Sequence, residues 1–132
     1  MGQRILVVED DPHFLGILRD YLRFAGYEVV EADDGLAGWE AFDARPPDIV
    51  LSDVLLPLMD GFELATRINE DPRADRVPVI LMSAVHKDAV AIRMDLKDCG
   101  AADYLVKPFS MMELKSKLER ARGRATRGAD GP

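Results

Sequence analysis

Four short apolar runs of this sequence each end at a residue that can bind a divalent cation or a phosphoryl group. The residues at these ends are Glu9, Asp10 and Asp11 after 5–8, Asp53 after 49–52, Ser83 after 79–82, and Lys107 after 104–106. If the runs are neighbouring parallel strands, their carboxyl ends meet at one edge of the sheet, where open α/β sheets bind ligands. We therefore predict that these residues form one functional site.

Three of these side chains are carboxylates that would lie within a few ångströms of one another. Glu9 and Asp10 at one strand end and Asp53 at the next would repel unless they bind a proton or a cation. Magnesium suits such a site because it takes few carboxylates and keeps waters and a phosphate oxygen as its other ligands. We predict Asp10 and Asp53 as direct ligands, Glu9 as a ligand directly or through water, and the backbone carbonyl near Leu55 as a further ligand.

The same strand ends carry the groups that phosphoryl transfer needs. With the cation bound, the Asp53 carboxylate can attack an incoming phosphoryl group and form an acyl phosphate. Such a transfer depends mainly on positioning and charge neutralisation. We predict that Lys107 supplies a fixed positive charge and that Ser83 supplies a hydroxyl donor to the phosphoryl oxygens.

Strand and helix patterns alternate along the chain, which predicts a parallel sheet with crossover helices. Strands are expected at about 4–8, 27–31, 48–52, 77–82 and 103–106, and a fourth helix at about 88–98. Signals for the start of a helix are Asp11 before Pro12, Asp60 before Gly61, and Ser110 with Glu113 three residues later. These elements place the charged strand ends at one edge.

Length and composition suit a single domain, since the chain has 132 residues of which 48% are hydrophobic. No apolar run approaches the roughly 18 residues of a membrane-spanning helix. The net charge of −7 argues against nucleic-acid binding by the domain. From Gly123 onward no large apolar side chain is available for burial, so we expect a domain at 1–122 and a flexible tail or the start of a linker at 123–132.

The motifs together resemble the receiver domain of bacterial two-component response regulators over roughly residues 3–122. The matching segments are 7–11 (VVEDD), Asp53 followed by 56–61 (LPLMDG), Ser83-Ala84, and 100–109 (GAADYLVKPF). The resemblance implies a flavodoxin-like, doubly wound α/β fold with five helices and a five-stranded parallel sheet in the order 2-1-3-4-5. It also implies a cis peptide bond between Lys107 and Pro108.

The resemblance implies a cytoplasmic phosphoacceptor switch rather than an enzyme with a separate substrate. Asp53 would take a phosphoryl group, with Mg²⁺, from a histidine kinase or histidine phosphotransfer protein. Ser83 and Tyr104 would then change the face formed by the fourth helix, strand 103–106 and the last helix, and with it the affinity for a downstream effector or a second copy of the chain. Because Leu55 and Val85 flank the approach of water, the domain would lose its phosphoryl group slowly.

Two other classes of function compete with this reading. A phosphatase of the haloacid-dehalogenase type also forms an aspartyl phosphate, but it needs an aspartate two residues after the nucleophile, where this chain has Leu55. A phosphorylation-independent interaction module would usually lack the acceptor aspartate or the lysine, and this chain keeps both. A P-loop nucleotide enzyme is excluded, because the sequence has no GxxxxGK[ST] motif.

Overall fold

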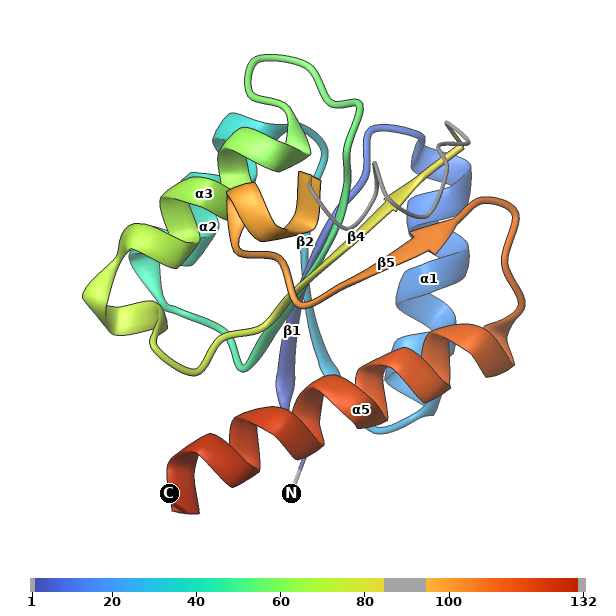
Figure 1. The fold of residues 1–132 in the computed structure, drawn as a ribbon. Coiled ribbons are helices and arrows are strands. Elements are labelled where there is room, and N and C mark those ends of the chain that lie inside the picture. Colours follow the sequence, from blue (N-terminus) through green and yellow to red (C-terminus); the bar gives the residue numbers. More distant parts are fainter. Residues whose placement is uncertain (1, 85–94, 131–132) are drawn as a thin grey trace.

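The computed structural model describes residues 2–84 and 95–130, with side chains described as far as Gly123 in the last helix. Five parallel strands form one sheet in the order β2-β1-β3-β4-β5 (Figure 1). Their bounds are β1 Arg4–Val8, β2 Glu28–Ala32, β3 Ile49–Asp53, β4 Val79–Ser83 and β5 Asp103–Val106. This order confirms the prediction, and it places the switch point between β1 and β3, where the connections turn to opposite sides of the sheet.

Helices cover both faces of the sheet (Figure 1). The helices are α1 Pro12–Phe24, α2 Gly35–Ala44, α3 Gly61–Glu70 and α5 Met111–Asp130, with a 3₁₀ turn at Pro72–Ala74 and helical residues at 95–99. α1 and α5 lie on one face, and α2, α3 and the segment 95–99 lie on the other. None of the helices in the described part of the chain is long and apolar enough to span a bilayer.

The apolar strands divide their side chains between two cores, one on each face of the sheet. In β1, Ile5 and Val7 pack with the buried residues of α1 and α5, whereas Leu6 and Val8 pack with those of α2 and α3. Successive side chains of a strand point to opposite faces, so a strand covered on both faces must be apolar throughout. Each fully buried aliphatic side chain contributes about 1.5–3 kcal/mol. These cores fix the strand ends that carry the charged residues.

All three predicted helix starts are confirmed by capping contacts. The Asp11 carboxylate accepts a hydrogen bond from the His13 backbone N–H at 3.0 Å, and Asp60 accepts one from Glu63 at 2.9 Å. Ser110 and Glu113 form the reciprocal pair, with the Glu113 N–H donating to the Ser110 hydroxyl at 3.1 Å. Each cap contributes about 0.5–2 kcal/mol. The cap of α1 directly follows Glu9 and Asp10, and the cap of α3 follows Asp53 after the loop 54–59.

Several boundaries differ from those expected. Strands β2, β3 and β4 end one residue later than predicted, so Asp53 and Ser83 are strand residues, paired with Met82 and Val106 respectively. The helix α5 continues to Asp130, past Gly123, in a segment whose arginine and alanine residues favour helix. The division into a domain at 1–122 and a tail at 123–132 stays a prediction. Of the expected helix at 88–98, residues 88–94 lie outside the described residues.

Candidate functional site

Backbone hydrogen bonds hold the ends of the strands together at the carboxyl edge of the sheet. The Glu9 N–H donates to the Ala32 carbonyl at 3.0 Å, just beyond the end of β1. The Val54 N–H donates to the Met82 carbonyl at 2.9 Å, and the Lys107 N–H donates to the Ser83 carbonyl at 2.9 Å. The ladder thus continues one residue past β1, β3 and β5, which fixes the backbone at each functional side chain.

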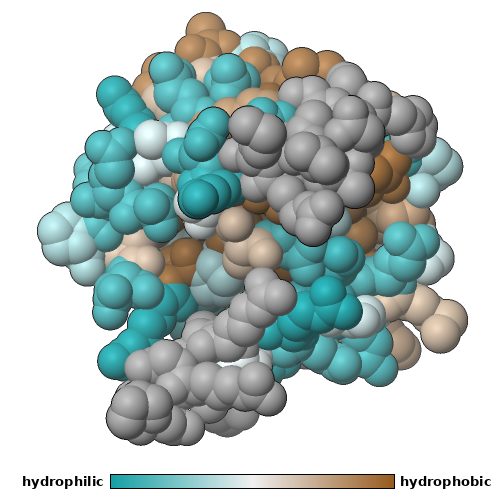
Figure 2. Space-filling model, in the orientation of Figure 1, coloured by the Kyte–Doolittle hydropathy of each residue, from teal (hydrophilic) through white to brown (hydrophobic). Residues whose placement is uncertain are grey.

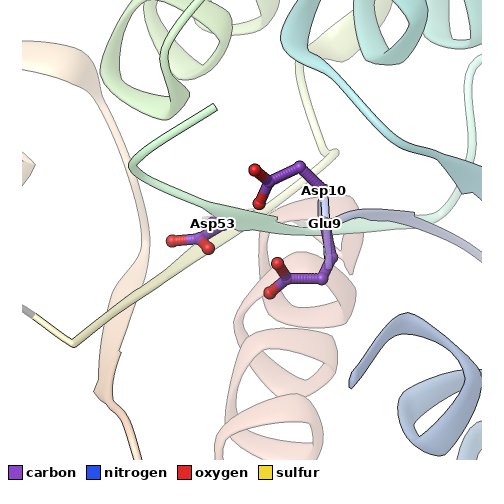
Figure 3. Close-up of side chains that lie close together, drawn as sticks. All are labelled: Glu9, Asp10 and Asp53. Atoms are coloured by element: carbon purple, nitrogen blue, oxygen red, sulfur yellow. The ribbon is translucent and has the colours of Figure 1, made fainter. Parts of the chain in front are cut away.

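The three predicted carboxylates come together at this edge. Glu9 and Asp10 follow β1 and Asp53 ends β3, and their side chains project to the same side of the strand ends (Figure 3). One carboxylate oxygen from each lies within 4.8 Å of the other two. Glu9 and Asp53 are buried, whereas Asp10 is exposed. Oxygen atoms of carboxylates that lie this close together, with Asp10 exposed, could hold a hard divalent cation.

Lys107 reaches across the sheet from the end of β5 to the same cluster. Its Nζ atom lies 2.6 Å from Oε1 of Glu9 and 2.8 Å from Oδ2 of Asp53. The structure therefore brings Lys107 into contact with the predicted acceptor, although 54 residues separate the two in sequence. The peptide bond that joins Lys107 to Pro108 is cis, as predicted.

Burial and charge shift the pKa values of both ends of this contact. Burial raises the pKa of Glu9 above its ordinary value, and the nearby charge of Asp53 adds to the rise, against hydrogen bonds from Lys107 and the Asp11 backbone. Burial also disfavours the Lys107 ammonium, but hydrogen bonds to Asp53 and Glu9 outweigh it and raise the pKa of Lys107. Three carboxylates face one ammonium here, so the site carries an excess of negative charge.

The loop between β3 and α3 is held in place by two glycines. The Gly61 N–H donates to the Val54 carbonyl at 2.8 Å, and a Cβ atom on Gly61 would collide with the Asp53 carbonyl oxygen. The Gly35 N–H at the start of α2 donates to the Pro57 carbonyl at 3.2 Å. Within this loop Leu55 is 62% exposed, and its N–H lies 3.4 Å from Oδ1 of Asp53. The Leu55 side chain thus stands at the opening of the site.

The two predicted switch residues occupy neighbouring strands. Ser83 is buried at the end of β4, one residue beyond the partner of Asp53. Tyr104 in β5 is half-buried and packs against the core on the α2 and α3 side. Val85, which was expected to shield the phosphoryl group together with Leu55, lies outside the described residues. The functional roles of these residues stay predictions.

One neighbour of the site was not expected from the sequence. The Phe14 ring, in the first turn of α1, lies over the Lys107 ammonium, with Nζ 4.8 Å from the ring centroid. Phe109 meets the same ring edge to face, with the centroids 5.8 Å apart. Phe14 also packs against the α1 and α5 core. Because Phe14 and Lys107 lie far apart in the sequence, no sequence pattern indicates the contact between them.

A doubly wound parallel sheet with acidic residues at its switch point and a lysine from the last strand defines a class of signalling domain. Residues 5–119 match the family of the response regulator receiver domain. The chain belongs to this family, whose members are phosphoacceptor domains of two-component systems that bind Mg²⁺ at the acidic site and interact with histidine kinases. The predicted resemblance is therefore confirmed.

The curated relatives are longer proteins. The chain is 38% identical over 132 residues to the response regulator MprA of Mycobacterium sp. (strain KMS), covering 100% of this chain and 55% of that protein. It is 34% identical over 115 residues to the DNA-binding dual master transcriptional regulator RpaA of Synechocystis sp., covering 87% of this chain and 47% of that protein. The chain thus spans about half the length of these relatives.

Solved structures share the whole fold. A putative response regulator from Chloroflexus aurantiacus has a TM-score of 0.84 at 32% identity, covering 93% of this chain and 99% of that one. The receiver domain of sensor histidine kinase PA1611 from Pseudomonas aeruginosa has a TM-score of 0.83 at 33% identity, with the same coverage, and holds a magnesium ion in its active site cleft. The likeness extends over nearly the full length of both domains.

Proposed function

We propose that this domain is a phosphoacceptor switch in which Asp53 receives a phosphoryl group from a histidine kinase or histidine phosphotransfer protein. The observation that carries this proposal is the contact of the Lys107 ammonium with Asp53, 2.8 Å away, inside a cluster of carboxylates. A lysine in this position holds the acceptor oxygen and can also neutralise the phosphoryl group that arrives there.

Magnesium is the cofactor that fits the donor set of the site. Asp10 and Asp53 would be direct ligands, Glu9 would bind directly or through water, and the Leu55 carbonyl would complete the protein ligands. The excess negative charge, and the pKa of Glu9 raised by burial, both indicate a site that is costly to keep without a cation. When bound, Mg²⁺ would neutralise charge on the phosphoryl oxygens and hold them in position.

The transfer itself exchanges one bond to phosphorus for another. An Asp53 carboxylate oxygen attacks phosphorus, the new P–O bond forms, and the P–N bond of the donor phosphohistidine breaks. The bonding pair leaves with the ring nitrogen, and the imidazole leaves neutral when its other nitrogen carries the proton. Lys107 then turns its N–H donors from the carboxylate to a phosphoryl oxygen, and the Ser83 hydroxyl donates to another.

The output would pass through Ser83 and Tyr104 to the face formed by residues 95–99, β5 and α5. Ser83 moves toward the phosphoryl group, and Tyr104 turns into the space that it leaves. Asp103, next to Tyr104, accepts from Lys117 of α5 at 2.8 Å, so a change at Tyr104 reaches α5 directly. Packed interiors adopt discrete arrangements, so this shift separates two states with different affinity for an effector or for a second copy.

Mass spectrometry tests the assignment of the acceptor. The protein is incubated with acetyl phosphate and Mg²⁺, and the intact mass is followed. We expect a gain of one phosphoryl group that requires the metal, is lost in Asp53→Asn and falls strongly in Asp10→Asn. Labelling of Asp53→Asn to the same extent as the parent, at another residue, would show that Asp53 is not the acceptor.

A further inference from the structure

The Lys107 ammonium is bounded by two different kinds of group. Two of its three N–H donors are directed at carboxylates, Oε1 of Glu9 at 2.6 Å and Oδ2 of Asp53 at 2.8 Å. The face of the Phe14 ring lies on another side, 4.8 Å from Nζ. The lysine side chain is only 20% exposed, so the ring contact is partly shielded from water.

The Phe14 ring is held in place by Phe109, which lies in the loop between β5 and α5. Phe109 follows Lys107 by two residues and contacts Phe14 edge to face, at an interplanar angle of 72°. Both rings are half-buried and pack against the core on the α1 and α5 side. Because Asp11 caps α1 three residues before Phe14, the backbone under the ring is fixed as well. The first turn of α1 thus supports the lysine that follows β5.

An aromatic face holds a cation in a way that suits a lysine with changing partners. The ring attracts the ammonium through its quadrupole and has no lone pair that accepts its N–H donors in a fixed direction. A carboxylate or water in that position would accept one of them. Lys107 therefore keeps its donors available as its partner changes from the Asp53 carboxylate to a phosphoryl oxygen, while its Nζ atom stays in place. A leucine at position 14 would fill similar space without this attraction.

We propose that Phe14 is a positioning residue for phosphoryl transfer, acting on Lys107 through the face of its ring. The inference rests on the proposed function, since Lys107 has to act on the phosphoryl group for its position to affect the rate. Through Phe14, α1 would then contribute to phosphoryl transfer as well as to the packing of the core. The simpler alternative is that Phe14 only fills space beside Phe109.

Fluorinated phenylalanine distinguishes the two possibilities, because fluorine weakens the ring's attraction for a cation while the shape changes little. Phe14 is replaced by phenylalanine with one, two and then three ring fluorines, and labelling by acetyl phosphate with Mg²⁺ is timed. We expect the rate to fall stepwise with each fluorine. Phe14→Leu should be slower by roughly 3- to 20-fold, the range of a partly buried cation–π contact, and Phe14→Tyr should stay near the parent.

A matched control removes a similar contact elsewhere. Arg67 lies over the Trp39 ring, 5.5 Å from its centroid, on the opposite face of the sheet. Trp39→Leu should lower stability and leave the labelling rate within about twofold of the parent, since the lost cation–π contact does not involve Lys107. If Trp39→Leu slows labelling as much as Phe14→Leu does, the effect belongs to general destabilisation and the inference fails.

A second readout needs no metal and no phosphoryl donor. In the metal-free protein the ε-methylene protons of Lys107 should resonate upfield of ordinary lysine signals, because the Nζ atom next to them lies over the face of the Phe14 ring, and this shift should vanish in Phe14→Leu. An unchanged rate across the fluorinated series, in a parent that is labelled at Asp53, would overturn the inference and leave the proposed function intact. A parent without Asp53 labelling would overturn the proposed function, and the Lys107 shift would still decide whether the ring holds the lysine.

Discussion

Lys107 and Glu9 form the shortest described ion pair of the site, with Nζ 2.6 Å from a carboxylate that is 1% exposed. A buried charged pair stabilises a fold only when its desolvation is fully offset. For Glu9 it is not, because burial and the neighbouring Asp53 charge raise the pKa of Glu9 despite its hydrogen bond to Lys107. The buried carboxylate therefore costs stability, whereas the raised pKa of Lys107 means that the ammonium is stabilised by its contacts with Glu9 and Asp53.

This relationship predicts how stability changes with pH in the metal-free protein. Because folding raises the pKa of Glu9 above its ordinary 4.5, the folded state holds the proton more tightly than the unfolded state. Stability is then lost as pH rises from 4.5 through the raised pKa of Glu9, and the loss is complete above that pKa. Glu9→Gln should raise the free energy of unfolding once Glu9 is ionised in the parent, because glutamine keeps the shape of the side chain and removes the charge whose burial is costly.

Urea unfolding in EDTA between pH 4 and 8 measures this effect. The difference between Glu9→Gln and the parent should grow as pH rises and then stay constant. A variant that is less stable than the parent at pH 7 would mean that the bond to Lys107 outweighs the cost of burying the charge.

Magnesium should stabilise the folded domain through the carboxylate cluster. A ligand that binds only the folded state at about 100 times its dissociation constant adds about 2.7 kcal/mol. We expect Mg²⁺ to raise the melting temperature of the parent, and Asp10→Asn to abolish most of the rise. Asp33→Asn is the control, because Asp33 is an exposed carboxylate outside the cluster. An equal rise in Asp10→Asn and the parent would place the ion elsewhere.

The lifetime of the phosphorylated state should depend on the residues at the opening of the site. Leu55 is exposed beside Asp53, and its side chain cannot hydrogen-bond a water or direct one at the acyl phosphate. Replacing Leu55 with Asn and Val85 with Glu should speed loss of the phosphoryl group by about tenfold or more, since orienting the attacking water lowers the barrier. The loss of mass after removal of the donor measures the rate. Parent and double variant with equal rates would contradict this role.

Asp103 should couple the switch strand to α5. Its carboxylate accepts from Lys117 at 2.8 Å, lies 3.7 Å from Arg120 and also accepts the Tyr104 backbone N–H. Asp103→Asn should increase hydrogen exchange in α5 and reduce the response of α5 to beryllofluoride. Asp20→Asn, which removes an exposed ion pair with Arg19, is the control. If α5 responds fully in Asp103→Asn, the signal reaches it by another route. On the face shown in Figure 2, hydrophilic residues alternate with smaller hydrophobic patches.

The sequence predicts that the functional side chains meet at the carboxyl edge of the sheet, because each lies at or just after the end of an apolar strand and parallel strands end together. The apolar pattern predicts that β3 and β4 end one residue before Asp53 and Ser83. In the structure these two polar residues belong to the strands, because pairing such as that of Asp53 with Met82 depends on the register between strands and not on apolar side chains. The contact of Phe14 with Lys107 escapes prediction for a different reason. It depends on how the first turn of α1 faces the loop after β5, and no local pattern encodes that orientation.

The last prediction concerns the residue at which the folded domain ends. Ala121 is buried at 2% exposure and is the last buried side chain in the described part of α5, whereas Arg122 and Gly123 are exposed. A chain that ends at Arg122 should therefore keep its free energy of unfolding within about 0.5 kcal/mol, the usual range for changes away from the core. A chain that ends at Leu118 loses Ala121 and the last turn around it and should be clearly less stable. Urea unfolding and acetyl phosphate labelling compare the three. If the chain ending at Arg122 is already destabilised by about 2 kcal/mol or loses labelling, residues 123–132 belong to the folded domain and the boundary is wrong.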